Sequence, residues 1–229
     1  MDAKGISSTE PGAHRMLERM LFLSDGVFAI VMTLLVLDLR VPPGMTDAGL
    51  LHAFVVLGPK LSAFATSFVL VSVFWVAHAS ITRDLQKFDW PVAWANLAFL
   101  FALAWAPFAA TLLGEFGTFG NAWRFYCLAL IVMGSTQVIL LLVISRDHGR
   151  LLGGLGRRQF WYRLVRAGSP SVGFSVALAV SLAGLPQVSY FCWILIPVTL
   201  IVARLLFKPD GDKTITAPAK RSRAKRAKS

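Results

Sequence analysis

The sequence predicts an all-α integral membrane protein, and two observations support this prediction. The chain of 229 residues is 56% hydrophobic and only 15% charged, which leaves too few charges to cover a soluble protein of this size. Its apolar residues also come in long blocks separated by short charged loops. That pattern is typical of a chain that crosses a bilayer several times.

Six apolar blocks are long enough to span, because about 20 residues of helix cross about 30 Å of hydrocarbon. They are residues 20–39, 59–81, 91–113, 123–145, 167–184 and 189–207. The fifth gives the weakest signal, since it is short and rich in Ser and Gly. Between the first two blocks, residues 50–57 predict a short helix at the outer surface, which Gly58 and Pro59 end.

The basic residues lie mostly on one side of these spans. Of the 23 Lys and Arg, the predicted outer side holds only Arg40 and Arg124, with Lys60 near a helix end. By the positive-inside rule, both termini are expected in the cytoplasm. We therefore divide the chain into a cytoplasmic N-terminus (1–18), a six-helix transmembrane domain (19–207) and a basic, disordered cytoplasmic tail (208–229).

The net charge of +11 is concentrated in loops and in the tail, which ends "KRSRAKRAKS". A nucleic-acid site would place aromatic residues among the basic ones, and this tail has none, so nucleic acid is not an expected partner. We favour a solvated segment that anchors the topology. Contact with anionic lipid headgroups is the alternative. The two cysteines, Cys127 and Cys192, fall inside predicted spans and are expected to pack as small apolar residues.

Polar residues interrupt the first span, "ERMLFLSDGVFAIVMTLLVLDLRVPP". A carboxyl group at membrane depth usually faces the protein interior and a partner, and it marks a candidate site. His78 lies near the cytoplasmic end of the second span, at a similar depth, and Asn96 can join from the third. We expect a polar cluster that locks the first three helices together, made of Arg19, Ser24, Asp25, His78 and Asn96. For Arg19, a role as an interfacial anchor is the simpler alternative.

An apolar stripe follows the polar residues on the first span. Ile30, Leu34 and Leu37 share one helix face, and Thr33 borders it. Asp25 points about 140° away from this face by the helical period. Taken from the residues alone, the stripe is best explained as a face toward lipid or toward the core.

The order of residues in three spans resembles a known family. "RMLFLSDGVFAIVMTLLVLDL" resembles the first-helix signature of the transmembrane protein 175 family, R-x-x-x-F-S-D followed by an apolar run with a threonine. Arg19, Ser24, Asp25 and Thr33 fall in register, and Leu23 occupies the phenylalanine position. "FATSFVLVSVFWVAHASI" resembles the second helix of the family, and "NLAFLFALAWAPFAATLLGE" the third. The resemblance covers residues 19 to about 115, with the remainder similar in hydropathy alone.

The resemblance implies a potassium-permeable channel in a bacterial cell membrane, built as a homotetramer whose first helices line the pore. Ile30, Leu34 and Leu37 would form a hydrophobic constriction, Thr33 would add hydroxyls, and the polar cluster would be structural. The residues are consistent with this expectation. There is no "TVGYG" segment for a carbonyl-lined filter, and no span has arginine at every third position as a voltage sensor does.

Other functions were weighed against the channel. A proton-coupled secondary transporter would use Asp25 and His78 as a proton relay, but no internal repeat of the kind found in transporters is evident. A scaffold that recruits partners through its basic loops is a third possibility. An enzyme is not expected, because the four histidines are scattered at 14, 52, 78 and 148 and no nucleophile elbow or phosphate-binding loop occurs. No cofactor or metal is expected beyond permeating potassium ions.

Overall fold

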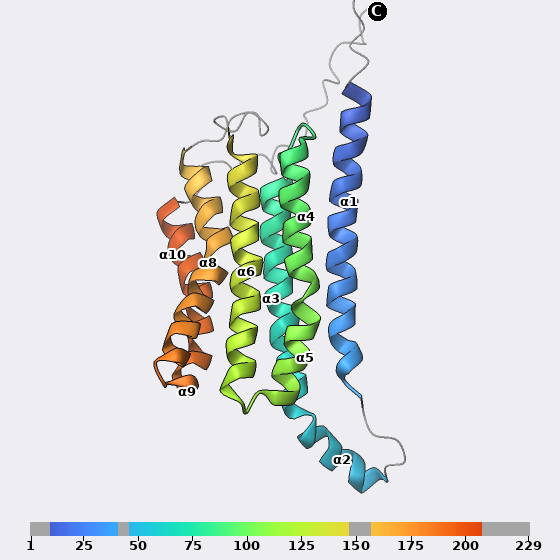
Figure 1. The fold of residues 1–229 in the computed structure, drawn as a ribbon, viewed down its shortest axis with the longest axis vertical. Coiled ribbons are helices and arrows are strands. Elements are labelled where there is room, and N and C mark those ends of the chain that lie inside the picture. The colour runs from blue at the N-terminus through green and yellow to red at the C-terminus, as the bar shows by residue number, and fades with distance from the viewer. Residues whose placement is uncertain (1–9, 41–45, 147–156, 208–229) are drawn as a thin grey trace, which may run out of the picture.

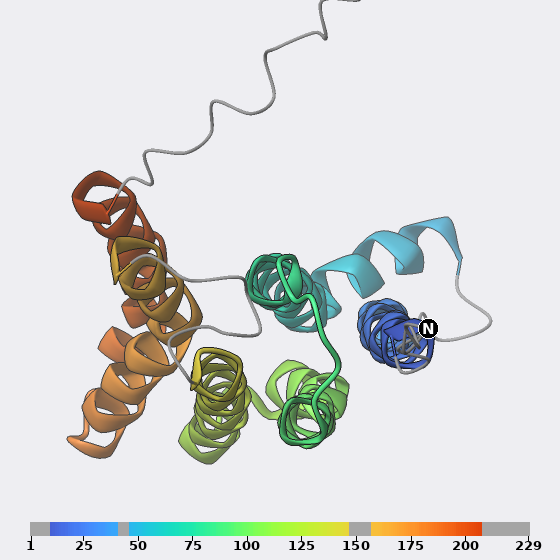
Figure 2. The ribbon, with the colours of Figure 1, turned by 90° about the horizontal axis from the view of Figure 1, so that it is seen from above.

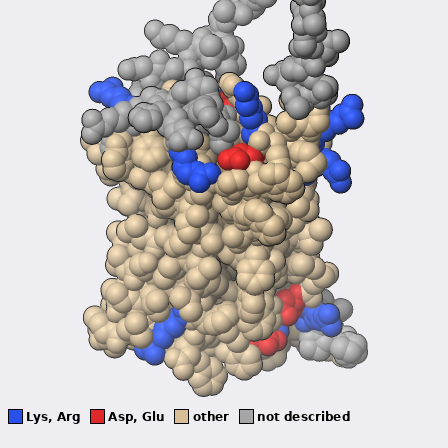
Figure 3. Space-filling view, turned by 45° about the horizontal axis from the view of Figure 1, so that its top comes forward, with Lys and Arg blue, Asp and Glu red and all other residues tan. Residues whose placement is uncertain are grey.

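A computed structural model describes residues 10–40, 46–146 and 157–207. The described residues are helical throughout, apart from turns and short connections. Six stretches are long and apolar enough to cross a membrane: Gly12–Asp38, Gly58–Thr82, Trp90–Phe116, Gly120–Ile144, Arg158–Leu182 and Pro186–Leu206. The predicted all-α fold with six spans is confirmed. Figure 3 shows charged side chains at both ends of the visible face and an uncharged band between them, as a bilayer requires.

The first half of the chain forms one edge of the bundle (Figures 1 and 2). Helix α1 (Glu10–Leu34) continues as the 3₁₀ turn η1 (Leu35–Asp38). Helix α2 (Asp47–Val56) lies across the lower end of the bundle in Figure 1 and leads into α3 (Gly58–Thr82). The hydroxyl of Thr46 caps α2 by accepting a hydrogen bond from the Gly49 N–H at 3.3 Å. Helix α1 packs against α3 and α4, so it stands beside the bundle rather than within it.

The third span is broken into α4 (Trp90–Ala104) and α5 (Ala106–Phe116). Pro107 lies in the first turn of α5, where a missing N–H and a fixed φ are tolerated. At the junction the Trp105 N–H donates to the Ala102 carbonyl at 3.3 Å, a tighter i→i−3 bond. The proline in the expected third span therefore divides one crossing into two helices.

The second half forms the other edge. Helix α6 (Gly120–Ile144) is central and packs against α4, α5 and α8 (Arg157–Leu182). Short elements α9 (Pro186–Ser189) and η3 (Tyr190–Ile194) lead to α10 (Leu195–Phe207), which packs on α8. The sequence-based start of the fifth span at residue 167 was wrong, because the helix begins at Arg157. Its first turns carry arginines that lower the hydropathy without preventing a helix.

Two buried clusters hold the bundle together. The larger is rich in aromatic side chains and lies between the middle of the spans and the α2 end, with Phe28, Phe74, Phe99, Trp123, Tyr126 and Phe174 among its members. The smaller lies near the start of α1 and includes Leu17, Ile81, Val92, Leu140 and Ala167. Close approach of α6 and α8 occurs at Gly134, where a Cβ atom would collide with the Ser171 hydroxyl and lie 3.2 Å from its backbone nitrogen.

Candidate functional site

Helix α1 divides into a buried face and an exposed face. The buried face repeats every three to four residues, as a helix packed along one side must, and consists of Leu17, Met20, Ser24, Phe28, Val31 and Leu35. These residues face α3 and α4. Only Ser24 among them is polar, so its position in the packed interior calls for a partner.

That partner is Asn96 on α4. The Asn96 Nδ2 atom donates to the Ser24 hydroxyl oxygen at 2.9 Å, and the hydroxyl donates to the Met20 carbonyl oxygen at 3.0 Å. Because the amide uses its nitrogen for Ser24, its Oδ1 atom accepts from His78 Nε2 on α3, also at 2.9 Å. Ser24, His78 and Asn96 are each at most 2% exposed. The three residues thus connect α1, α4 and α3 through side chains that water does not reach.

Aromatic rings enclose the His78 imidazole. It stacks on Phe99 with ring centroids 5.3 Å apart, and Phe28 lies at 5.6 Å on another side. The Thr82 hydroxyl donates to the His78 carbonyl oxygen one turn later, at 3.0 Å. Such packing fixes the ring in one orientation, with Nε2 directed at Asn96.

Asp25 has a different partner from the one expected. The indole nitrogen of Trp75 on α3 donates to Asp25 Oδ1 at 3.1 Å, whereas the His78 ring nitrogen bonds to Asn96. Trp75 and His78 are three residues apart and therefore share the face of α3 that meets α1. Both residues lie within the second-helix segment "FATSFVLVSVFWVAHASI", but no role was predicted for the tryptophan. The i,i+3 spacing was the signal that could have identified it.

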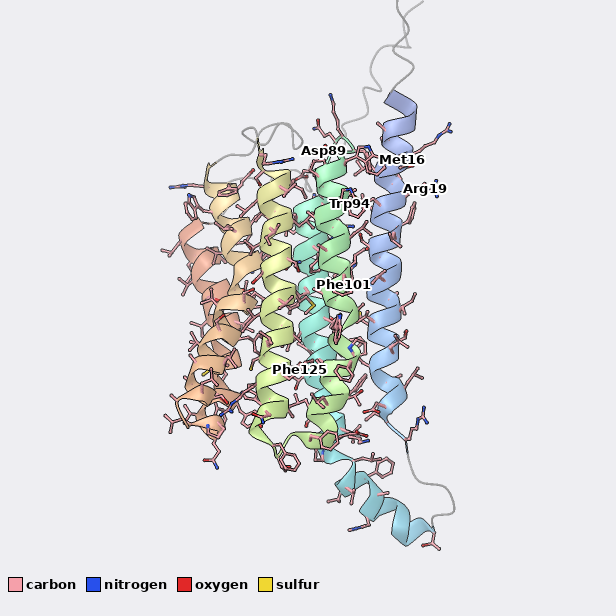
Figure 4. The ribbon with its side chains drawn as sticks, viewed as in Figure 1. Met16, Arg19, Asp89, Trp94, Phe101 and Phe125 are labelled. Carbon is pink, nitrogen blue, oxygen red and sulfur yellow. The ribbon has the colours of Figure 1, made fainter. Side chains whose placement is uncertain are left out.

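Arg19 does not join the cluster. It lies one turn before Ser24 and is exposed, and Figure 4 shows its side chain directed away from the neighbouring helices. Within the described ranges, no hydrogen bond or ion pair involves its guanidinium group. Of the five residues expected in one polar cluster, the structure joins Ser24, His78 and Asn96 by hydrogen bonds and ties Asp25 to Trp75 beside them.

The exposed face of α1 carries the apolar stripe. Ile30 and Leu37 are 59% and 60% exposed, and Leu34 is 42% exposed. Thr33 lies among them, and its hydroxyl donates back to the helix, with the Ala29 and Ile30 carbonyl oxygens at 3.0 and 2.8 Å. Because the hydroxyl proton is used within the helix, the oxygen lone pairs remain available as acceptors on the exposed face.

Exposed aromatic side chains run along the third span beside α1. Trp94 and Phe101 on α4, labelled in Figure 4, are 68% and 70% exposed. Phe101 contacts Trp105, and the edge-to-face contacts continue to Phe108 and then to Phe125 on α6. This aromatic stripe is apolar enough to meet either lipid or a second protein surface.

Comparison with known proteins identifies a family that this chain resembles. The sequence model of the family described as the endosomal/lysosomal potassium channel TMEM175 matches residues 19–107. This region contains all nine residues singled out from the sequence, on α1, η1, α3 and α4. Over this region the chain is similar to the TMEM175 family. The expectation that it is not an enzyme is confirmed by this match, since the family is described as one of ion channels.

Bacterial and vertebrate TMEM175 relatives differ in their described activity. The potassium channel HX13_20290 of Chryseobacterium sp. (strain P1-3) is 34% identical over 126 residues, which are 55% of this chain and 64% of that protein. The endosomal/lysosomal proton channel TMEM175 of Danio rerio is 25% identical over 140 residues, which are 61% of this chain and 26% of that protein. The chain spans between 45% and 64% of the length of the bacterial curated relatives.

A solved structure extends the TMEM175 likeness to the whole bundle. The crystal structure of a lysosomal potassium-selective channel TMEM175 homologue from Chamaesiphon minutus superposes with a TM-score of 0.65 at 25% identity. The superposition covers 85% of this chain and 97% of that chain. The chain therefore has the TMEM175 fold of a multi-pass membrane protein.

Proposed function

We propose that this chain forms a potassium-permeable cation channel in a bacterial cell membrane, with α1 lining the pore. The observation that carries the proposal is the division of α1 into two faces. One face is fixed to α3 and α4 by buried hydrogen bonds. The other leaves Ile30, Thr33, Leu34 and Leu37 exposed in the single chain. The bacterial relatives named as potassium channels support the same function.

Four copies around one axis would turn the exposed stripe into stacked rings. Rings of Ile30, Leu34 and Leu37 would form a hydrophobic constriction, which blocks ions by dewetting and conducts when it widens or becomes hydrated. A ring of Thr33 oxygens between them would offer acceptors to a partly dehydrated cation. Selectivity in such a pore depends on its diameter and on these oxygens, so a modest preference for potassium follows.

The homotetramer is part of this proposal, since one α1 helix cannot enclose a pore. In a closed ring each subunit uses two different flanks, one against each neighbour. Helix α1 stands at the edge of the bundle with α3 on one side and α4 on the other (Figure 2). The aromatic stripe on α4 and α5 supplies an apolar surface on one of these flanks.

Within this pore the hydrogen bonds of Ser24, Asp25, His78 and Asn96 have a structural role. They hold the buried face of α1 against α3 and α4, and so they fix the rotation that directs Ile30 toward the axis.

Arg19 would act at the membrane boundary. The charge bias supports a cytoplasmic position for both termini, which would put α2 outside. The basic tail, residues 208–229, lies outside the described residues, and for it we keep the proposed role of a solvated topology anchor, with contact to anionic lipid as the alternative.

A proton-coupled transporter based on Asp25 and His78 is less well supported. The two residues bond to different partners, Trp75 and Asn96. The vertebrate relatives named as proton channels make proton permeation a necessary control in any flux experiment. Such permeation would still occur through a pore, so it does not require a carrier.

Ion flux through the purified full chain in liposomes tests the proposal. Wild type should conduct potassium in preference to sodium, and Ile30→Asn should lose that preference because a hydrated ring replaces an apolar one. Val36→Asn is the matched control, since Val36 is similarly exposed at 46% but lies on another face of the helix. A pH-sensitive dye measures proton flux in parallel.

The outcomes separate the candidates. Equal selectivity of wild type and Ile30→Asn would contradict the pore assignment. Absence of potassium and sodium flux from folded protein would contradict the channel and leave a carrier or a scaffold. Native mass spectrometry checks the assembly, because four chains of 25.0 kDa are expected in each particle.

A further inference from the structure

A large cavity opens at the α2 end of the bundle, away from the proposed pore. Its volume is about 1060 Å³, and its walls come from the end of α2, α3, α5, the α5–α6 turn, α6, α8 and η3. No residue of α1 lines it. The cavity therefore belongs to no feature of the channel discussed so far, and its use goes beyond the proposed function.

The cavity walls are held in place by specific contacts. The Tyr190 hydroxyl of η3 donates to the Gly117 carbonyl oxygen at 2.8 Å, and its ring packs against Trp123 with centroids 4.4 Å apart. On α6, Arg124 donates to the Ser181 hydroxyl and carbonyl oxygens of α8 at 3.2 and 3.0 Å. These contacts join segments that are far apart in sequence, so the cavity is preformed.

The opposite wall is equally constrained. Gly114 of α5 lies so close to α3 that a Cβ atom there would be 3.2 Å from the Lys60 Cα atom. One residue later, Glu115 accepts a hydrogen bond from Lys60 Nζ at 2.9 Å. The cavity thus has one charged edge, formed by this ion pair, while Trp123, Tyr126, Phe174 and Phe191 contribute aromatic walls.

The position of the cavity relative to the membrane indicates its occupant. Lys60 is in the first turn of α3 and Trp123 in the first turn of α6, so both lie near one membrane boundary. Apolar cavities exclude water and accept hydrocarbon, and acyl chains are the hydrocarbon that surrounds a membrane protein. In the same wall, the buried indole N–H of Trp123 has no acceptor among the described residues. Phospholipid ester carbonyls would be close to this depth.

The Lys60–Glu115 ion pair at the charged edge favours some lipid headgroups over others. It presents a cation and an anion side by side, and neither is more than 40% exposed. A purely anionic headgroup would meet the Glu115 carboxylate as a like charge. A headgroup with a phosphate and a primary ammonium complements both ends of the pair through charge-assisted hydrogen bonds.

We propose that this cavity binds a zwitterionic aminophospholipid of the phosphatidylethanolamine type. One acyl chain lies along the aromatic walls, the phosphate meets Lys60, and the ammonium meets Glu115. A quaternary ammonium headgroup has no N–H to donate and fits less well.

Native mass spectrometry of the full chain in mixed micelles tests the proposal. The micelles contain equal amounts of phosphatidylethanolamine, phosphatidylcholine and phosphatidylglycerol, and the retained lipid is identified by mass. Wild type should retain phosphatidylethanolamine over phosphatidylglycerol by roughly tenfold, the factor expected when one charge-assisted bond is exchanged for a repulsion. Glu115→Gln should reverse the preference toward phosphatidylglycerol, because Lys60 then stands as an uncompensated cation.

A second pair of variants tests the cavity itself. Thr66→Trp places a large ring into the lining and should abolish lipid retention. Val69→Trp is the control, since Val69 is 60% exposed on the same helix and does not line the cavity. Retention by Thr66→Trp at the wild-type level would overturn the site, and equal retention of all three lipids would overturn the headgroup assignment. In folded Glu115→Gln protein, the reversal tests the headgroup assignment even if a tryptophan variant does not fold.

Discussion

The Trp75 indole nitrogen donates a hydrogen bond of 3.1 Å to the Asp25 carboxyl oxygen. This contact joins α3 to α1 immediately beside the buried bonds of Ser24, Asn96 and His78. It satisfies one oxygen of a carboxyl group that is exposed in the single chain, at a depth where unpartnered polar groups are costly.

A double-mutant cycle measures this contact. Trp75→Phe and Asp25→Ala should each destabilise the fold, and their effects should not add, because either change removes the same bond. We expect a coupling energy of about 0.6 kcal/mol, the average for hydrogen bonds between membrane helices, and at most about 1.7 kcal/mol. The measurement is the free energy of unfolding during titration with sodium dodecyl sulfate in mixed micelles. Asp25→Asn keeps an acceptor oxygen and should keep the coupling with Trp75. Additive losses would show that the two side chains act independently.

Asn96 should be more sensitive than Ser24. Asn96→Leu removes two interhelical bonds and leaves the Ser24 hydroxyl and the His78 ring without their partner, so we expect a loss of about 2–4 kcal/mol. Ser24→Ala removes one interhelical bond and should cost about 1 kcal/mol. Unfolding in the same mixed micelles compares them. If Ser24→Ala proves the more damaging change, the central position of Asn96 is disproved.

The crossing of α6 and α8 gives a prediction about packing. Gly134→Val should destabilise the fold by about 1–3 kcal/mol through overpacking, because its side chain would meet the backbone of Ser171. Gly168→Ala is the control, since a Cβ atom there would lie 3.6 Å from the Val138 side chain, an ordinary contact. Thermal unfolding in detergent separates the two variants, and similar melting temperatures for both would refute the close crossing.

Thr33 should influence selectivity without influencing the fold. Thr33→Val has nearly the same shape but no oxygen, and we expect the potassium-to-sodium permeability ratio to fall about fivefold, as about 1 kcal/mol of lost differential stabilisation would produce. Thr33→Ser keeps the oxygen and should keep the ratio. Liposome flux under a potassium or a sodium gradient makes the measurement. A wild-type ratio in Thr33→Val would remove Thr33 from the proposed pore.

The membrane spans could be predicted from local composition, whereas the contacts between them depend on how the helices pack. The spans were predictable because hydropathy depends on local composition, and errors arose where composition misleads, as in the arginine-rich start of α8. The polar residues of α1, α3 and α4 were recognisable as candidates because polar groups are rare in a membrane. The hydrogen-bond partners of these residues could not be predicted, since pairing depends on the rotation and relative depth of the helices. The structure therefore assigns Asp25 to Trp75 and His78 to Asn96, which one-dimensional spacing did not resolve.

The cavity was beyond the reach of the sequence for a similar reason. Its walls combine residues from both halves of the chain, such as Lys60 and Tyr190, and none of them forms a recognisable local motif. The pairing of Lys60 with Glu115 joins residues 55 positions apart. Only the packing of α3 against α5 brings the two charges together.

The buried hydrogen bonds that link α3, α4 and α1 form a series in which each residue donates to the next. His78 donates to Asn96, Asn96 donates to Ser24, and Ser24 donates to the Met20 carbonyl oxygen. A proton that entered this series at the imidazole would have to leave through a peptide carbonyl, which accepts hydrogen bonds but has no proton of its own to pass on. This series of hydrogen bonds therefore cannot pass a proton from the imidazole across the membrane.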